Sequence, residues 1–191
     1  MEIEPGSLSF QPVTPERWED FEALFGVNGA CAGCWCMWWR ETRSQYSQLA
    51  GEGNKQRMYE IIQAGRVPGL LAYLEGQPVG WVSVAPREEF PSLDRSQVAK
   101  RVDEQPVWSL VCFFIRKGYR RRGLTGALIG AAASYAREQG AEVLEAYPVE
   151  YESKVNGSGE FTGFASTFRR AGFVEVARRK EKRPVMRLAL K

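Results

Sequence analysis

The sequence contains no histidine among its 191 residues. Histidine is the side chain that most often moves protons near neutral pH, and it is also the commonest metal ligand in proteins. Its absence excludes histidine-based catalytic triads, histidine general bases and histidine-containing metal sites within this polypeptide. Any chemistry must therefore use carboxylates, hydroxyls, thiols, the backbone or water.

The chain also lacks long apolar runs and a strong charge of either sign. No apolar stretch approaches the length of a membrane span, and the acidic first residues are unlike a signal peptide. We therefore expect no membrane association and a cytoplasmic location. The net charge of +3 is too small to favour nucleic acid as a partner. The length and the 44% hydrophobic content predict a single domain over residues 1–191, as a monomer or a homodimer.

Cysteine is scarce, but three of the four cysteines fall within six residues, at Cys31, Cys34 and Cys36. Tryptophans lie among and after them, at Trp35, Trp38 and Trp39. In the cytoplasm such cysteines are thiols or ligands rather than disulfides. Three interpretations are open: a zinc site completed by Cys112, an apolar patch of buried thiols, or a substrate pocket walled by the tryptophans.

Hydrophobic periodicity predicts a mixed chain of strands and helices. Strands are expected over 8–13, 69–74, 79–85, 107–115, 142–149, 173–178 and 184–190. Helices are expected over 15–25, 55–64 with Asn54 as its cap, 96–102, from 124 to Gly140, and 163–171, with a polar loop over 150–162.

The strongest motif is the strand, basic loop and helix over 107–136. A helix that follows a glycine loop presents unpaired amides and the positive end of its dipole, which is a site for phosphate groups. The spacing Gly118 to Gly123 to Thr125 also fits the loop of nucleotide-triphosphate-binding proteins, except that Leu124 replaces the lysine. An anionic, phosphate-bearing ligand other than a nucleoside triphosphate is therefore expected.

The hexapeptide from Arg120 to Thr125 resembles the acyl-CoA motif [RQ]-x-x-G-x-[GA] of the GNAT acetyltransferases, with Thr125 where Gly or Ala is usual. The order of the expected elements is similar to that family as well. The resemblance implies an α/β (α+β) GNAT fold, in which a mixed, mostly antiparallel sheet of about six to seven strands is flanked by helices and splayed at its centre. It implies acetyl-CoA as co-substrate, bound by Cys112, Phe113, Phe114, Ile115, Arg120, Arg121, Arg122, Gly123, Leu124, Thr125 and Gly126.

The reaction that the resemblance implies is acetyl transfer from acetyl-CoA to an amine, by direct attack in a ternary complex. Phe168 stands where many members carry a tyrosine that protonates the leaving thiolate, and Ser109 stands where one branch carries a glutamate base. The candidates that remain are Tyr147 as acid, Glu145 as base, and Ser166 on the last helix.

The acceptor is expected to be a small-molecule amine in a pocket walled by Trp35, Trp38, Trp39 and Tyr147. Two alternatives remain open. One is a GNAT-fold protein that binds acyl-CoA without turnover, and the other is a cysteine-rich zinc-binding module.

Overall fold

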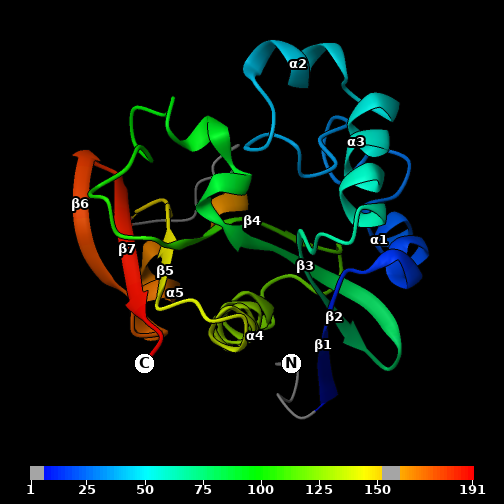
Figure 1. Ribbon diagram of the computed structural model, residues 1–191. Coiled ribbons are helices and arrows are strands. Elements are labelled where there is room, and N and C mark those ends of the chain that lie inside the picture. Colours follow the sequence, from blue (N-terminus) through cyan, green and yellow to red (C-terminus); the bar gives the residue numbers. More distant parts are fainter. Residues whose placement is uncertain (1–6, 152–159) are drawn as a thin grey trace.

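The computed structural model describes residues 7–151 and 160–191, and a seven-stranded sheet lies at its centre (Figure 1). The strand order is β1-β2-β3-β4-β5-β7-β6. Only β4 and β5 run parallel, and the other neighbouring pairs are antiparallel. This confirms the predicted architecture. The strands are β1 (Leu8–Pro12), β2 (Gly69–Leu74), β3 (Gln77–Pro86), β4 (Trp108–Ile115), β5 (Val143–Ala146), β6 (Val174–Lys180) and β7 (Arg183–Ala189).

Helices cover both faces of the sheet (Figure 1). On one face α4 packs against β3, with Leu128 beside Val82 in a cluster that also includes Phe168 of α5. On the other face α1 and α3 cover β2 and β3, with Phe21 beside Trp81. The helices are α1 (Trp18–Phe25), α2 (Arg43–Gln48), α3 (Glu52–Gln63), α4 (Leu124–Glu138) and α5 (Ala165–Arg170), with short 3-10 helices η2 (Pro15–Arg17), η3 (Arg87–Glu89), η4 (Pro91–Leu93) and η5 (Glu160–Thr162).

Each predicted strand is found, with small shifts at its ends, and β5 ends at Ala146 rather than at residue 149. The polar loop expected over 150–162 lies mostly outside the described residues. Within the described part of the chain, no helix combines the length and the apolar character that crossing a membrane requires.

Asn54 was wrongly predicted to cap a helix. Helix α3 begins earlier, at Glu52, with Gly51 before it, so Asn54 lies inside the first turn. Its side chain is buried and donates hydrogen bonds from Nδ2 to the carbonyls of Gly33 and Tyr46, at 3.0 and 3.3 Å. Asn54 therefore ties the cysteine-rich segment to α3 instead of starting the helix.

The helix predicted over 96–102 is also wrong, because this stretch consists of turns and bends. The Ser96 hydroxyl accepts hydrogen bonds from the amides of Val98 and Ala99, at 3.2 and 3.1 Å. A serine side chain that satisfies nearby amides in this way competes with helical hydrogen bonding.

Helix α2 was not predicted from the sequence. Thr42 and Gln45 form a capping box at its start, in which each side chain bonds the other residue's backbone amide. The T-x-x-Q spacing is the signal that announces such a helix. The helix was not predicted because this stretch was interpreted only through the cysteines and tryptophans that precede Thr42.

A β-bulge lies in the middle of β4. Ser83 of β3 pairs with Cys112, but the next residue, Val84, pairs with Leu110, so Val111 is an extra residue in β4. A bulge bends its strand and increases the local twist. Pairing between β4 and β5 ends at Leu110, and among the described strands none pairs with the rest of β4 on that side. The two central strands therefore diverge from the bulge onward.

Candidate functional site

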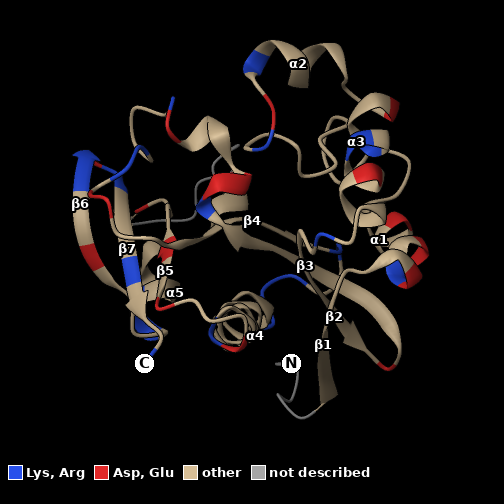
Figure 2. Ribbon diagram, in the orientation of Figure 1, with Lys and Arg blue, Asp and Glu red and all other residues tan. Residues whose placement is uncertain are grey.

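The segment that joins β4 to α4 is a basic turn bounded by glycines, and its blue stretch leads into the start of α4 in Figure 2. Gly118 and Gly123 have φ angles of 102° and 86°, a left-handed conformation in which a side chain would be strained. A Cβ added at Gly118, Gly123 or Gly126 would meet no atom within 4 Å. The backbone of this turn is therefore open to close approach by a ligand.

The first turn of α4 supplies amide donors beside that open backbone. Gly123 is the N-cap, and its carbonyl accepts from the amides of Gly126 and Ala127, at 3.0 and 3.3 Å. The amides of Leu124 and Thr125 precede these, at a position where an α-helix has no carbonyl to offer. The helix dipole adds partial positive charge at the same place. Together these features favour an anion, although the Gly126 amide would have to share its hydrogen.

Arginines surround the turn. Arg120 and Arg121 are exposed, and Arg120 Nε donates to the carbonyl of Ile115 at 2.9 Å, which fixes the end of β4. Arg121 has a φ of 62°, unusual for a residue with a side chain. The Arg122 guanidinium lies 5.9 Å from the Tyr119 ring centre. Two guanidinium groups are thus available to solvent beside the helix start.

The segment that leads into α5 lies where β4 and β5 diverge. Val149, after β5, forms an isolated parallel bridge with Phe164, the residue before α5. A Cβ added at Gly163 would lie 3.1 Å from the ring of Phe113 on β4. Glycine is needed here because the chain passes directly over that ring. The open part of β4, the basic turn and the start of α5 therefore surround one region.

Tyr147 and Glu145 come together in a buried network. The Tyr147 hydroxyl donates to Glu145 Oε1 at 2.7 Å and lies 2.8 Å from Ser109 Oγ on β4. Arg87 donates to both Tyr147 and Glu145, at 2.7 and 3.0 Å, and Arg187 Nε donates to Glu145 Oε2 at 2.7 Å. Burial, reinforced by the Glu145 charge, raises the pKa of Tyr147 well above its usual value.

Glu145 is only 1% exposed, and both of its oxygens pair with arginine. Both of its oxygens are therefore occupied within the network. Sequence reasoning missed the partners Arg87 and Arg187, because an arginine in a loop or on an edge-near strand usually points to solvent. Ser166, the third catalytic candidate, is exposed on α5 and shares no described contact with this network.

The predicted pocket tryptophans separate into two groups. Trp39 and Tyr147 belong to one buried cluster around Val111, with Trp38 packed against it. Trp35 instead stacks on Phe25 in the aromatic core under α1, with ring centres 5.7 Å apart. All three tryptophans lie on the face of the sheet opposite α4, but Trp35 belongs to a different cluster from Trp38 and Trp39.

The four cysteines are free thiols with different surroundings. Cys31 is exposed, Cys34 and Cys112 are half-buried, and Cys36 is buried. Among the residues that the structure describes, no three potential ligands from cysteine, aspartate and glutamate come together as a metal site would require. The zinc-module alternative therefore gains no ligand set from the fold.

Comparison with protein families shows the family of this chain. The model of the acetyltransferase (GNAT) family matches residues 17–154, well over half of the chain. The chain belongs to the GNAT acetyltransferase family. The match includes β4, the basic turn, α4 and β5, and it ends before α5.

Solved structures share this GNAT fold at low sequence identity. The PaiA N-acetyltransferase from Thermoplasma acidophilum, in complex with coenzyme A, is 13% identical with a TM-score of 0.54, covering 96% of this chain and 99% of that one. A GNAT acetyltransferase from Listeria monocytogenes is 12% identical with a TM-score of 0.58, covering 95% and 94%. An N-acetyltransferase from Staphylococcus aureus is 13% identical with a TM-score of 0.55, covering 96% and 99%. No curated protein matches the sequence.

Proposed function

We propose that the chain is an N-acetyltransferase that moves the acetyl group of acetyl-CoA to a small-molecule amine, by direct attack in a ternary complex. The observation that carries this proposal is the divergence of β4 from β5 after Leu110, in the strand that leads through the basic turn to the amide-rich start of α4. The edge of β4 is thereby available to the thioester of acyl-CoA, and the start of α4 is available to its diphosphate.

The diphosphate is the part that the basic turn would bind. Amides of Leu124 and Thr125 point out of the helix start, and Arg120 and Arg121 supply positive charge that solvent can reach. Gly123 allows the close approach, because nothing stands within 4 Å of where its Cβ would be. The coenzyme A in the Thermoplasma acidophilum neighbour supports the same class of co-substrate here.

The thioester is the part that β4 would hold. Backbone groups of the strand from Cys112 to Ile115 have no described strand partner on the β5 side, so an amide there can polarise the carbonyl that the amine attacks. When the carbon–nitrogen bond forms, the carbon–sulfur bond breaks and the CoA thiolate leaves. A water molecule takes the proton that the amine must lose.

The amine would approach from the face of the sheet that carries Trp38 and Trp39. Trp39 Nε1 is buried, and it has no hydrogen-bond partner within the described part of the chain. An unpaired buried donor is costly, so this N–H would gain a hydrogen bond from a polar oxygen or nitrogen of the substrate. Flat aromatic walls suit a compact amine better than a polypeptide tail.

Tyr147 as acid, Glu145 as base and Ser166 as a further catalytic candidate stay predictions. The buried network favours a positioning role for the first two, since it joins β5 to β4 through Ser109 where pairing ends. In that role Tyr147 and Glu145 fix how far β4 and β5 separate. Tyr147, held neutral by burial, could still supply a proton to the thiolate.

A second candidate function is acyl-CoA binding without turnover. Phe168 is fully buried against Phe173, with ring centres 5.0 Å apart, and has no hydroxyl to offer where many GNAT proteins carry one. This observation favours a protein that holds acyl-CoA as a ligand.

One experiment distinguishes the two functions. Acetyl-CoA binding is measured by calorimetry, and acetyl transfer to a panel of aliphatic, aromatic and polyamine acceptors is followed by mass spectrometry. We expect binding together with acetylation of at least one small amine. Binding without any acetylated product supports the non-catalytic alternative, and absence of binding contradicts both.

A further inference from the structure

The cysteine-rich segment carries its most buried thiol on a strained backbone. Trp35 and Cys36 have φ angles of 44° and 61°, in the left-handed region that residues with a side chain rarely adopt. This conformation directs Cys36 against the sheet, where it is 4% exposed. Strain of this kind persists only where surrounding contacts enforce it, and it is concentrated at functional positions.

A polar donor meets the Cys36 sulfur in an otherwise apolar layer. The indole N–H of Trp81, on β3, donates to Cys36 Sγ at 3.3 Å. Cys112, on β4, packs against the same cluster as Cys36. The indole N–H favours the anionic form of the sulfur, because the thiolate is the better acceptor.

The β4 bulge is the reason that Cys112 faces Cys36. Leu110 and Phe113 pack toward α4, in the cluster on that face of the sheet. Val111 and Cys112 both pack on the opposite face, so the alternation of the strand is interrupted there. If β4 kept the same sequence but alternated regularly without the bulge, Cys112 would share the α4 face with Leu110 and point away from Cys36.

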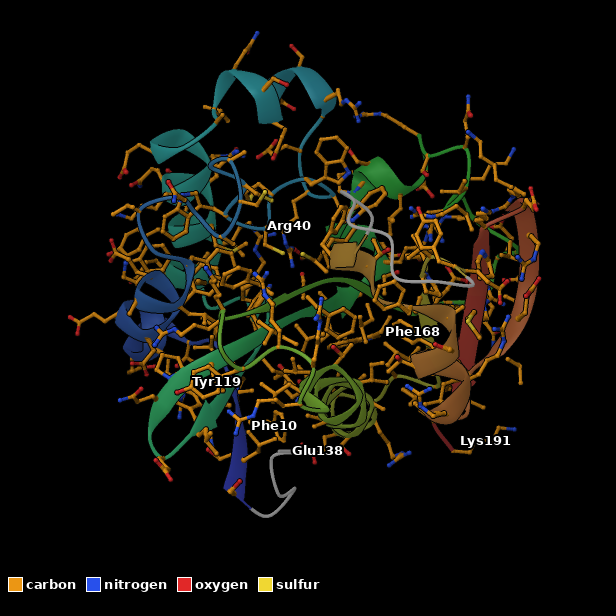
Figure 3. All side chains as sticks on the ribbon, turned by 180° about the vertical axis from the view of Figure 1, so that it is seen from behind. Phe10, Arg40, Tyr119, Glu138, Phe168 and Lys191 are labelled. Carbon is orange, nitrogen blue, oxygen red and sulfur yellow. The ribbon has the colours of Figure 1, made fainter. Side chains whose placement is uncertain are left out.

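A buried positive charge lies near the same sulfur. Arg40 is 7% exposed, in the interior between the cysteine-rich segment and the sheet (Figure 3). It shares one carboxylate, Glu89, with a second arginine, Arg66. One carboxylate between two guanidinium groups leaves a positive charge that a Cys36 thiolate would balance. In the described part of the chain, Arg40 Nε is also buried without a hydrogen-bond partner.

These surroundings give the thiols of Cys36 and Cys112 different pKa values. The hydrogen bond from Cys112, then that from Trp81 and the charge of Arg40, lower the pKa of Cys36 to about 7 against the opposing effect of burial. The hydrogen bond to Cys36 and burial raise the pKa of Cys112 well above its usual value. Burial also raises the pKa of Cys34. Cys36 is therefore the most acidic of these three thiols.

We propose that Cys36 and Cys112 form a peroxide-reactive dithiol site, with Cys36 as the nucleophile and Cys112 as the resolving thiol. The Cys36 thiolate attacks one oxygen of hydrogen peroxide, the O–O bond breaks, and hydroxide leaves with Cys36 as the sulfenic acid. The Cys112 sulfur then attacks the Cys36 sulfur. A disulfide forms, and the sulfenic oxygen leaves with the Cys112 proton as water. The proposal does not rest on acetyl transfer, although Cys112 begins the stretch of β4 that is proposed to hold the thioester.

The test oxidises the reduced full-length protein with hydrogen peroxide, a probe small enough for a nearly buried thiol. Remaining thiols are alkylated in denaturant, and the protein is mapped by mass spectrometry. We expect two of the four cysteines to be protected, in a Cys36–Cys112 cross-link that dithiothreitol reverses. In Cys112→Ser, dimedone should label Cys36 as sulfenic acid. In Cys31→Ser, which alters an exposed thiol, the cross-link should form as in the wild type.

A second measurement keeps the proposal testable if a cysteine variant folds poorly. The rate of peroxide oxidation in the wild type should rise with pH around a midpoint near 7. Trp81→Phe removes the indole donor and should shift that midpoint upward by about one pH unit. Trp108→Phe, on the α4 face, is the matched control and should leave it unchanged. A cross-link between other cysteines, or equal midpoints in all three proteins, would overturn the assignment.

Discussion

Glu145 and Tyr147 are hydrogen-bonded to each other, hydroxyl to carboxylate across 2.7 Å, on the face of β5 that points away from α4. The sequence placed them on one face of one strand, and the fold adds two arginines that close the network. Because the network is buried, a change in any one residue leaves a charged or polar group of the others without its partner.

The charge of Glu145 is predicted to be needed for stability. Glu145→Gln leaves Arg87 and Arg187 with less compensation in a buried setting, so we expect the free energy of unfolding to fall by about 3 kcal/mol. Urea denaturation monitored by tryptophan fluorescence measures this. Glu138→Gln, at the exposed end of α4 (Figure 3), is the control and should change stability by less than about 0.5 kcal/mol. Equal effects of the two substitutions would contradict the structural role.

Tyr147→Phe separates a positioning role from a proton-donating one. Loss of the hydroxyl removes hydrogen bonds to Glu145 and Ser109, so stability should fall by about 1 to 2 kcal/mol. We expect the acetylation rate constant to fall less than about tenfold, with an unchanged pH profile. If the rate falls by about a hundredfold or more while stability is retained, Tyr147 is the acid instead.

Gly123 is predicted to be required for binding acyl-CoA. Its φ of 86° makes Gly123→Ala strained by about 1 kcal/mol, and the new methyl group would stand where the diphosphate approaches. Loss of one hydrogen bond to a charged group predicts an affinity for coenzyme A about tenfold lower. Gly130→Ala, on an exposed position of the same helix, should raise stability by about 0.5 to 1 kcal/mol and leave affinity unchanged. Calorimetry compares the affinities, and equal values for both variants would refute the site.

The charge of Arg121 can be tested apart from its backbone. Asparagine tolerates the left-handed conformation that Arg121 adopts, so Arg121→Asn should change stability by less than about 0.5 kcal/mol. Loss of one exposed guanidinium predicts an affinity for coenzyme A about fivefold lower at low ionic strength, with a smaller difference in high salt. Arg170→Ala, on α5, serves as the comparison and should bind like the wild type. A salt-independent loss would assign the effect to the backbone.

Asn54 is predicted to hold the cysteine-rich segment in place. Asn54→Ala removes the hydrogen bonds to the Gly33 and Tyr46 carbonyls and should cost about 1 to 3 kcal/mol. Hydrogen exchange of the Gly51 amide, which donates to the Gly33 carbonyl at 3.1 Å, should become faster in this variant. Gln56→Ala, exposed on the same helix, should leave both quantities unchanged. Protection of Gly51 that survives the Asn54 substitution would show that other contacts fix the segment.

The sequence was most informative where local patterns decide the structure. The apolar run of β4, the glycine turn and the alanine-rich helix are contiguous, so their order and the basic loop could be predicted from residue spacing alone. The hairpin of β2 and β3 was equally clear, since a short glycine turn separates its two apolar strands.

Contacts between distant residues were not predictable in the same way. Arg87, Ser109 and Arg187 converge on β5 from three separate elements, and nothing in their local sequence distinguishes them from solvated side chains. Asn54 looked like a helix cap because asparagine is favoured there. Its burial depends on Gly33, a residue brought close only by the folded loop.

The extra residue at Val111 also bears on how related sequences are compared. A strand is usually interpreted by strict alternation, which would assign Cys112 to the same face as Leu110 and α4. Counting must restart at Val111, and a relative that is one residue shorter in this strand cannot be matched to this chain without a gap there. In such a relative, a cysteine three residues before the end of the strand would still lie on the face opposite α4, directly after the residue that matches Leu110.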